Sequence, residues 1–149
     1  MISKKTKYAL KALLVLARNH VSQQPTLISD LAASERLPKK FLELILLNLK
    51  NEGILASKKG KGGGYMLSKN PDLIPIGQVI RILEGTLSPL PCLSQRAYQK
   101  CDDCVDETTC SIRSVMKEVR EATVQILNGT SLQDMLERAN ASEPLSYAI

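Results

Sequence analysis

The sequence predicts a mainly α-helical protein with one small β-hairpin. Hydrophobic residues recur at helical spacing through most of the 149 residues, and one glycine-rich stretch lies between two short extended runs. Aromatic residues make up 3% of the chain, which is low for a β-sandwich. Leucine, isoleucine, valine and alanine must therefore form the core, as in helices packed on helices.

The first 35 residues predict two helices. A first helix is expected from Ser3, a suitable N-cap residue, to about Asn19. After a polar loop at residues 21–26, a short helix is expected at Ile28–Ser34. The first helix has a wide apolar face and should be mostly buried. That face consists of Ala9, Leu10, Leu13, Leu14, Leu16 and Ala17.

A third helix is expected from Pro38 to about Glu52. Proline suits the first turn of a helix, and Gly53 suits the position just after its end. Two short helices joined by a few residues, the second opening with lysines, are typical of a helix-turn-helix. The buried face of the third helix is expected to contain Phe41, Leu42, Ile45, Leu46 and Leu49.

Two short strands are expected next, at Ile54–Ser57 and Tyr65–Ser68. Between them lies a basic, glycine-rich tip at residues 58–64, so the pair forms a β-hairpin of the kind called a wing. The glycines lack the Walker spacing and the Gly-Lys-Ser/Thr ending of a nucleotide-binding loop, and Pro71 and Pro75 follow in place of a helix. A wing is therefore favoured over a nucleotide site.

Further helices are expected on either side of a region without hydrophobic periodicity. One covers Ile76–Glu84, and a long helix of about five turns begins near Thr108 and ends before Gly129. Thr130 is expected to open a last short helix, with Gln133 completing a capping box. One apolar stripe follows the long helix and consists of Ile112, Val115, Met116, Val119, Thr123, Ile126 and Leu127.

Charge is divided unevenly along the chain. Residues 1–70 hold 13 Lys/Arg against 4 Asp/Glu, a net charge of +9, whereas residues 71–149 hold 7 against 11, a net charge of −4. A basic half of this kind favours a polyanionic partner such as nucleic acid. No apolar run reaches the roughly 18 residues that cross a bilayer. We therefore expect a soluble, intracellular chain with no membrane partner.

All four cysteines fall within one short region, at Cys92, Cys101, Cys104 and Cys110. A disulfide framework fits poorly, because the chain is expected to be intracellular and to have its own core. Four thiolates would satisfy a tetrahedral zinc site, and clustered thiolates on a loop equally suit an iron–sulphur cluster. Both metal sites stay open at this point, and unliganded thiols are the third interpretation.

Three segments of the chain resemble the Rrf-two family of bacterial winged-helix transcriptional regulators. They are residues 8–13 (YALKAL), residues 41–46 (FLELIL) and the wing at residues 59–65 (KGKGGGY), which is the most specific. The resemblance runs from residue 1 to about residue 138. It implies a homodimer that crosses through the long helix, with two winged helix-turn-helix units reading a pseudo-palindromic operator in double-stranded DNA.

The resemblance also implies a set of DNA-contacting residues, at the start of the third helix and at the wing tip. Among them, the Glu43 carboxylate is the expected base reader, because it can accept a hydrogen bond from cytosine N4. The lysines are expected to contact phosphates in preference to forming a solvated face, and Phe41 has core packing as its alternative role. The full set is Lys39, Lys40, Phe41, Glu43, Lys59, Gly60 and Lys61.

A cysteine pattern links the chain to the cluster-binding members of that family, which place five residues between successive cysteine ligands. Cys104 and Cys110 match the last two of these ligands, and Cys92 matches the first across a longer loop. Cys101 is an additional cysteine. With it, the resemblance implies four cysteine ligands in one subunit, for a 2Fe-2S or 4Fe-4S cluster or for zinc.

Non-cysteine ligands known from the family are missing. Arg113 occupies the position where some members have a histidine ligand, and residues 7–9 lack the carboxylate that other members take from the partner's first helix. His20, the one histidine, is expected at the surface. Cys101 is therefore the expected fourth ligand.

These observations predict a dimeric, sequence-specific DNA-binding transcriptional regulator, acting as a repressor in the bacterial cytoplasm. An iron–sulphur cluster or the redox state of the cysteines is expected to modulate its DNA binding. The alternatives are a regulator with a structural zinc site and no redox sensing, and an iron–sulphur electron-transfer protein. An enzyme is not expected, because the sequence contains no catalytic nucleophile with a general base at a recognisable spacing from it.

The expected organisation is mainly α with a small β-wing, a winged helix-turn-helix joined to a long dimerisation helix. The DNA-binding domain covers residues 1–84, and a cysteine-bearing sensor loop covers 85–109. The dimerisation helix and a short final helix cover 110–138, and a flexible tail covers 139–149.

Overall fold

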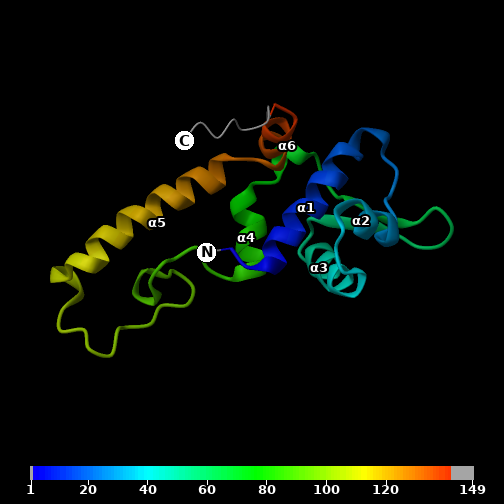
Figure 1. Ribbon diagram of the computed structural model, residues 1–149. Coiled ribbons are helices and arrows are strands. Elements are labelled where there is room, and N and C mark those ends of the chain that lie inside the picture. Colours follow the sequence, from blue (N-terminus) through cyan, green and yellow to red (C-terminus); the bar gives the residue numbers. More distant parts are fainter. Residues whose placement is uncertain (1, 142–149) are drawn as a thin grey trace, which may run out of the picture.

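The computed structural model describes residues 2–141 and confirms the mainly helical fold with a small wing (Figure 1). The described residues also form short 3-10 turns at His20–Ser22, Pro71–Leu73, Pro91–Leu93 and Glu107–Thr109. In chain order, the helices and strands are α1 Lys4–Arg18, α2 Ile28–Glu35, α3 Lys39–Asn51, β1 Leu55–Lys58, β2 Gly64–Leu67, α4 Ile76–Glu84, α5 Ser111–Gly129 and α6 Leu132–Ala141.

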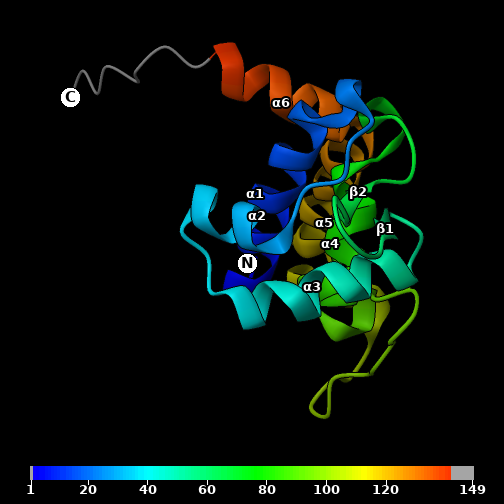
Figure 2. The same ribbon diagram turned by 90° about the vertical axis from the view of Figure 1, so that its right-hand side faces the viewer.

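Helix α1 is the centre of the core and contacts α2, α3, α4 and α6. Figure 2 shows α6 along one edge of this domain and α3 along the opposite edge. The predicted apolar face of α1 is largely buried, and Leu13 of α1 belongs to the same buried cluster as Leu31 and Ile45. Burial of one such side chain stabilises the fold by about 2 kcal/mol. Because α1 buries several of them, it contributes much of the stability of the core.

The end of α4 is tied to the start of α1. Ser3 caps α1 as predicted, because its hydroxyl accepts a hydrogen bond from the Thr6 backbone N–H at 3.2 Å. The Glu84 carboxylate accepts from the Thr6 hydroxyl at 2.5 Å and from the Ser3 backbone N–H at 2.7 Å. Hydrogen bonds from Ser3 and Thr6 lower the pKa of Glu84 to about 2. This contact fixes the end of α4 against the start of α1.

Glycines shape the wing. Strands β1 and β2 pair antiparallel, each within one residue of the predicted range, and Leu55 lies opposite Leu67. The backbone of Tyr65 also pairs with that of Thr26, through hydrogen bonds of 2.8 and 2.9 Å. Gly64 has φ +139°, and a Cβ there would lie 2.1 Å from the Thr26 carbonyl oxygen. Only glycine at position 64 therefore permits the pairing of Tyr65 with Thr26.

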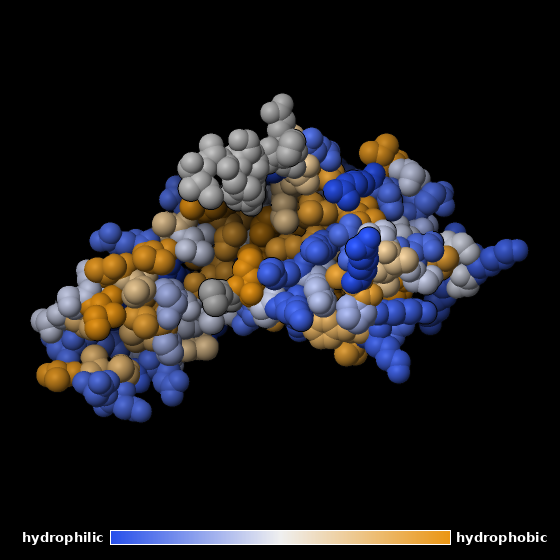
Figure 3. All heavy atoms as spheres, in the orientation of Figure 1, coloured by the Kyte–Doolittle hydropathy of each residue, from blue (hydrophilic) through white to orange (hydrophobic). Residues whose placement is uncertain are grey.

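Helix α5 extends from the domain as an arm, and the cysteine-bearing loop runs from the end of α4 along this arm to its far end (Figure 1). None of its residues is buried. The predicted apolar stripe is exposed, with Val115 at 58%, Val119 at 47% and Ile126 at 62% of their accessible surface. Hydrophobic residues are visible along the arm and in the recess where it meets the domain (Figure 3). Leu127, at the domain end of the stripe, packs against the core, whereas Val115, Val119 and Ile126 stay largely exposed among the described residues.

Two predicted helix starts are wrong. Helix α5 begins at Ser111, because Cys110 is its N-cap and the Cys110 sulfur accepts from the Arg113 backbone N–H at 3.4 Å. The last capping box is formed by Ser131 and Asp134, one residue later than predicted. The Asp134 carboxylate accepts from the Ser131 backbone N–H at 2.8 Å, which lowers the pKa of Asp134.

The last helix is also longer than predicted. Helix α6 continues to Ala141, so residues 139–141 of the expected flexible tail are helical, and residues 142–149 lie outside the described part.

His20, expected at the surface, is half-buried, and its Nε2 lies 2.9 Å from Asn70 Oδ1. Between residues 2 and 141, no helix combines the length and the hydropathy that a bilayer-spanning segment needs.

Candidate DNA-binding surface and cysteine site

A groove of about 410 Å³ lies between α2, α3 and the wing. Three of the predicted DNA-contacting residues line it: Lys39 and Glu43 from α3, and Lys59 from the wing. The two α3 residues are one helical turn apart and so share a face, and the wing is brought to that face by its pairing with Thr26. The groove thus combines positive charge with one carboxylate.

The other predicted contacts lie outside the groove lining. Lys40, Gly60 and Lys61 are exposed, the first on α3 and the others at the wing tip. Phe41 is 37% exposed and packs edge-to-face on Tyr8, with ring centroids 5.8 Å apart. The prediction that Phe41 is buried with the rest of its helix face is therefore wrong, because its ring rests on the outer side of α1.

Sequence reasoning missed several residues of this surface. Lys50 of α3, Lys58 of the wing and Ser29 of α2 also line the groove. Helical spacing could have found Lys50, because it lies on the same face as Lys39 and Glu43. Leu44 of α3 is 67% exposed. An exposed apolar side chain on this helix suits contact with a thymine methyl group.

The structure brings all four cysteines to one hollow of about 480 Å³ at the start of α5. Cys92 follows α4 and the first part of the loop, Cys101 and Cys104 come from its middle, and Cys110 is the N-cap of α5. Cys101 is exposed and the other three are half-buried. Residues spread over nineteen positions thus face one space.

Hydrogen bonds hold the cysteine-bearing loop in this form. The Cys101 thiol donates to Asp103 Oδ1 at 2.8 Å, and this bond raises the pKa of Cys101. The Cys104 backbone N–H donates to the Cys101 carbonyl at 3.1 Å, which makes the Cys-x2-Cys segment a tight turn. The Tyr98 hydroxyl donates to the Glu107 carboxylate, which raises the pKa of Tyr98.

Arg113 is half-buried at this site, and its guanidinium Nε is a fully buried polar atom. Its Nη2 donates to the Cys92 carbonyl at 3.4 Å, whereas its Nε is buried without a hydrogen-bond partner among the described residues. A buried guanidinium N–H without an acceptor is costly, and thiolates or inorganic sulphide would supply one. Four thiols beside a guanidinium N–H that lacks an acceptor therefore fit a bound group that is anionic and held by thiolates.

The thiols are not gathered around one point. Within residues 2–141, no three His, Cys, Asp or Glu side chains converge closely enough to hold a metal ion. A single zinc ion would need its sulfurs at about 2.3 Å from one centre. The donor chemistry and the shared hollow thus fit a thiophilic group, and ligation requires the loop to contract around it.

Comparison with known proteins identifies relatives over the whole chain. A family model described as Rrf2, an iron-dependent transcriptional regulator, matches residues 2–138. An rrf2-like HTH-type transcriptional regulator of Rhodobacter capsulatus is 45% identical over 147 residues, covering 97% of this chain and 98% of its own. These relatives are transcriptional regulators, and not enzymes.

Solved structures show the same architecture. The structure of CymR, the global cysteine regulator of B. subtilis, aligns with a TM-score of 0.76 at 31% identity and covers 92% of this chain and 96% of its own. The structure of T. potens IscR aligns with a TM-score of 0.73 at 28% identity, covering 99% and 94%. Both alignments include the winged domain and the long helix.

Proposed function

The chain belongs to the Rrf2 (Rrf-two) family of transcriptional regulators, and we propose that it is a dimeric, sequence-specific DNA-binding repressor controlled by its cysteine-bearing loop. The observation that carries this proposal is the presence of two separate sites in one chain. A basic groove between α3 and the wing suits a DNA duplex, and one hollow at the start of α5 collects all four cysteines. We place this function in the bacterial cytoplasm.

On the DNA side, α3 enters the major groove. Glu43 reads a base edge there, while Lys39 and Lys40 contact phosphates. The exposed wing tip, with Lys59, Gly60 and Lys61, reaches the adjacent minor groove. Phe41 contacts the DNA backbone while resting on Tyr8. This assignment uses the seven predicted residues. Their exposure supports it, as does the shared groove that Lys39, Glu43 and Lys59 line.

The dimer forms through α5. Its exposed stripe of Val115, Val119 and Ile126 is too apolar to be left in water, and a second copy of the same stripe covers it. Two recognition helices must lie about 34–36 Å apart to read successive turns of a duplex. A rotation of one subunit against the other through α5 would therefore change the affinity for a pseudo-palindromic operator.

Cys92, Cys101, Cys104 and Cys110 hold an iron–sulphur cluster, either 2Fe-2S or 4Fe-4S. Such a cluster, when bound, supplies redox sensitivity and lability to oxidants. The chain's own residues do the rest. The unpaired Nε of Arg113 would donate a hydrogen bond to a ligating thiolate, and order in the loop would reach α5 through Cys110, because Cys110 is the N-cap of that helix. Ordering the loop thereby fixes the start of the dimerisation helix.

Zinc at the same four cysteines is the competing assignment. The tight Cys101–Cys104 turn is typical of zinc ligands, and such a site would be structural without redox sensing. The family description as iron-dependent favours iron. An electron-transfer protein is disfavoured, because it would not need the basic groove.

The test is anaerobic purification followed by a visible absorption spectrum and counts of iron, sulphide and zinc per chain. Matching iron and sulphide with a coloured protein would support the cluster, and a colourless protein with equimolar zinc would overturn it. Cys101→Ala should lower metal occupancy if Cys101 is the fourth ligand, whereas the control Ser114→Ala should retain it. Full occupancy in Cys101→Ala would remove Cys101 from the ligand set.

A further inference from the structure

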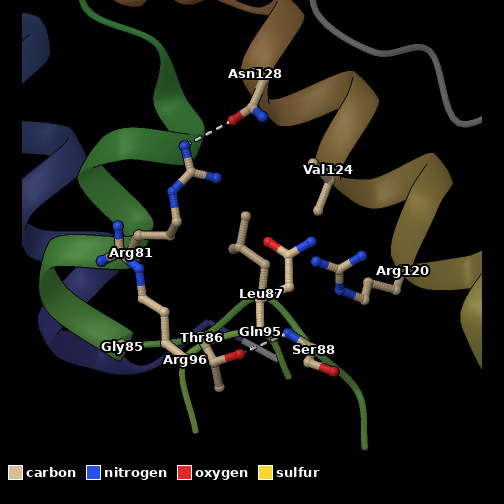
Figure 4. Close-up of a pocket in the computed structure, with 10 residues that line it drawn as sticks. All are labelled: Arg81, Gly85, Thr86, Leu87, Ser88, Gln95, Arg96, Arg120, Val124 and Asn128. Carbon is tan, nitrogen blue, oxygen red and sulfur yellow. Dashed lines mark hydrogen bonds between the residues drawn. The ribbon is translucent and has the colours of Figure 1, made fainter. Parts of the chain in front are cut away.

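A second hollow, of about 330 Å³, lies between α4, the first part of the cysteine-bearing loop and α5. Three arginines from these three elements line it: Arg81, Arg96 and Arg120 (Figure 4). None of its lining residues belongs to the cysteine hollow. The described lining contains no Asp or Glu and includes four neutral polar side chains, those of Thr86, Ser88, Gln95 and Asn128.

These arginines stand apart from the basic surface of the DNA-binding domain. Residues 71–149 are acidic overall, with 7 Lys/Arg against 11 Asp/Glu, yet three of the seven basic residues line this one hollow. Among the described residues, the ion pair that forms is Lys117 with Glu121, at 3.9 Å, and it includes none of the three. The arginines therefore gather without a carboxylate partner in the described chain, which is electrostatically unfavourable.

Two contacts prepare the hollow for a ligand. Arg81 Nη2 donates to Asn128 Oδ1 at 2.9 Å, so one guanidinium is held in place by α5. In Figure 4, the guanidinium of Arg120 points from α5 toward the side-chain amide of Gln95, and Arg96 lies on the α4 side. Arg81 and Arg120 thus line the hollow from the two helices, whereas the guanidinium of Arg96 is directed toward α4, on the other side of Leu87 from Arg120 (Figure 4).

We propose that this hollow binds a small anion that carries carboxylate or phosphate groups. Guanidinium groups bind both kinds of oxyanion through paired N–H donors, and three of them suit an anion with two or more negative charges. The volume is at the lower end of the roughly 300–1,000 Å³ range of small-molecule sites. The occupant is therefore a compact molecule and not a chain segment.

The position of the hollow gives the anion a structural consequence. Helix α4 is fixed to α1 through Glu84, and α5 is the arm, so an anion held by Arg81 and Arg120 joins the domain to the arm. Any effect of this on DNA affinity rests on the function proposed above. The binding itself does not, and it can be measured without DNA or metal.

The experiment is calorimetric titration of the full chain with inorganic phosphate and with citrate, at constant ionic strength. Both carry several negative charges, and whichever binds more tightly identifies the preferred oxyanion. Replacing Arg96 and Arg120 by Gln should weaken binding roughly tenfold for each arginine replaced. Gln95→Glu, which places a carboxylate in the hollow, should abolish binding, whereas the control Arg138→Gln on α6 should bind as the unmodified chain does.

Three results would overturn the proposal. The first is the absence of binding for both anions, and the second is equal binding by the double arginine variant and the Arg138→Gln control. The third is a double variant that binds both anions more weakly but also changes the dimer dissociation constant in sedimentation, with the same shift in the absence of any anion. In that case a carboxylate of the partner subunit fills the hollow.

Discussion

At the scale of single residues, Glu84 makes the clearest electrostatic contribution to stability. Its carboxylate accepts from Ser3 and Thr6, and its pKa is about 2 instead of the usual 4.5. A lowered folded-state pKa means that the stabilisation is complete above about pH 4.5 and is lost as the pH falls toward about 2. Acid should therefore loosen α4 from α1.

Glu84→Gln should lower the free energy of unfolding at pH 7 by about 1–2 kcal/mol, after allowance for solvent screening. Urea titrations from pH 7 to pH 3 would measure this difference, which should shrink below about pH 4.5. The exposed Glu118→Gln is the matched control and should have little effect at any pH. A difference for Glu84→Gln that stays constant down to pH 3 would assign the loss to packing and not to charge.

At the scale of elements, the wing depends on Gly64. A Cβ at this position would lie 2.1 Å from the Thr26 carbonyl oxygen, and φ is +139°. Gly64→Ala should therefore destabilise the protein by roughly 2 kcal/mol or more, as measured by urea unfolding. Gly129→Ala is the control, since a Cβ there meets nothing within 4 Å, and it should be nearly neutral. Equal stability of the two variants would contradict the claim that position 64 requires glycine.

The long helix provides a second prediction at this scale. Val119→Asp places a charge in the middle of the exposed stripe of α5 and should convert a dimer to a monomer in sedimentation velocity. Gln125→Asp, on the opposite face of the same helix, should leave the dimer intact. A dimer that survives Val119→Asp would place the interface on another surface.

The elements also show what a sequence can and cannot predict. The range Ile76–Glu84 is predicted in full, because its apolar periodicity lies between a proline and a glycine. The start of α6 is not, because Thr130 and Ser131 both offer a capping hydroxyl. Tertiary contacts decide between them: the Ile76 backbone N–H donates to the Thr130 carbonyl at 2.9 Å, which keeps Thr130 extended and moves the cap to Ser131.

In the candidate sites, too, the sequence predicts what depends on local spacing and does not predict what depends on contacts between distant segments. Helical spacing is enough to place Lys39 and Glu43 on one face of α3. The approach of Lys59 to that face depends on the pairing of Tyr65 with Thr26, which is distant in sequence. In the same way, the arginine hollow joins three separate segments of the chain, and no local pattern indicates it.

At the scale of the whole molecule, the proposed DNA complex predicts a specific salt dependence. Each lysine bound to a phosphate releases counterions, so the double variant Lys59→Ala with Lys61→Ala should reduce the slope of log K against log salt by roughly one for each phosphate-bound lysine replaced. Binding to all duplexes should weaken together, because lysines bound to phosphates carry no sequence information. Fluorescence anisotropy over a salt series measures this slope.

Lys117→Ala is the control for that experiment, because Lys117 lies on α5 and pairs with Glu121. Its slope should match that of the unmodified chain. A double wing variant with an unchanged slope would show that the wing tip does not contact phosphates.

The central claim is that the state of the cysteine-bearing loop controls DNA affinity. The most direct measurement is the dissociation constant of the anaerobically purified protein for a duplex selected by the protein itself, before and after the metal is removed by chelation. We expect the two constants to differ by about tenfold or more, equivalent to about 1.4 kcal/mol. Equal constants, with loss of the metal verified by analysis, would contradict the claim and leave the cysteine site without a role in DNA binding.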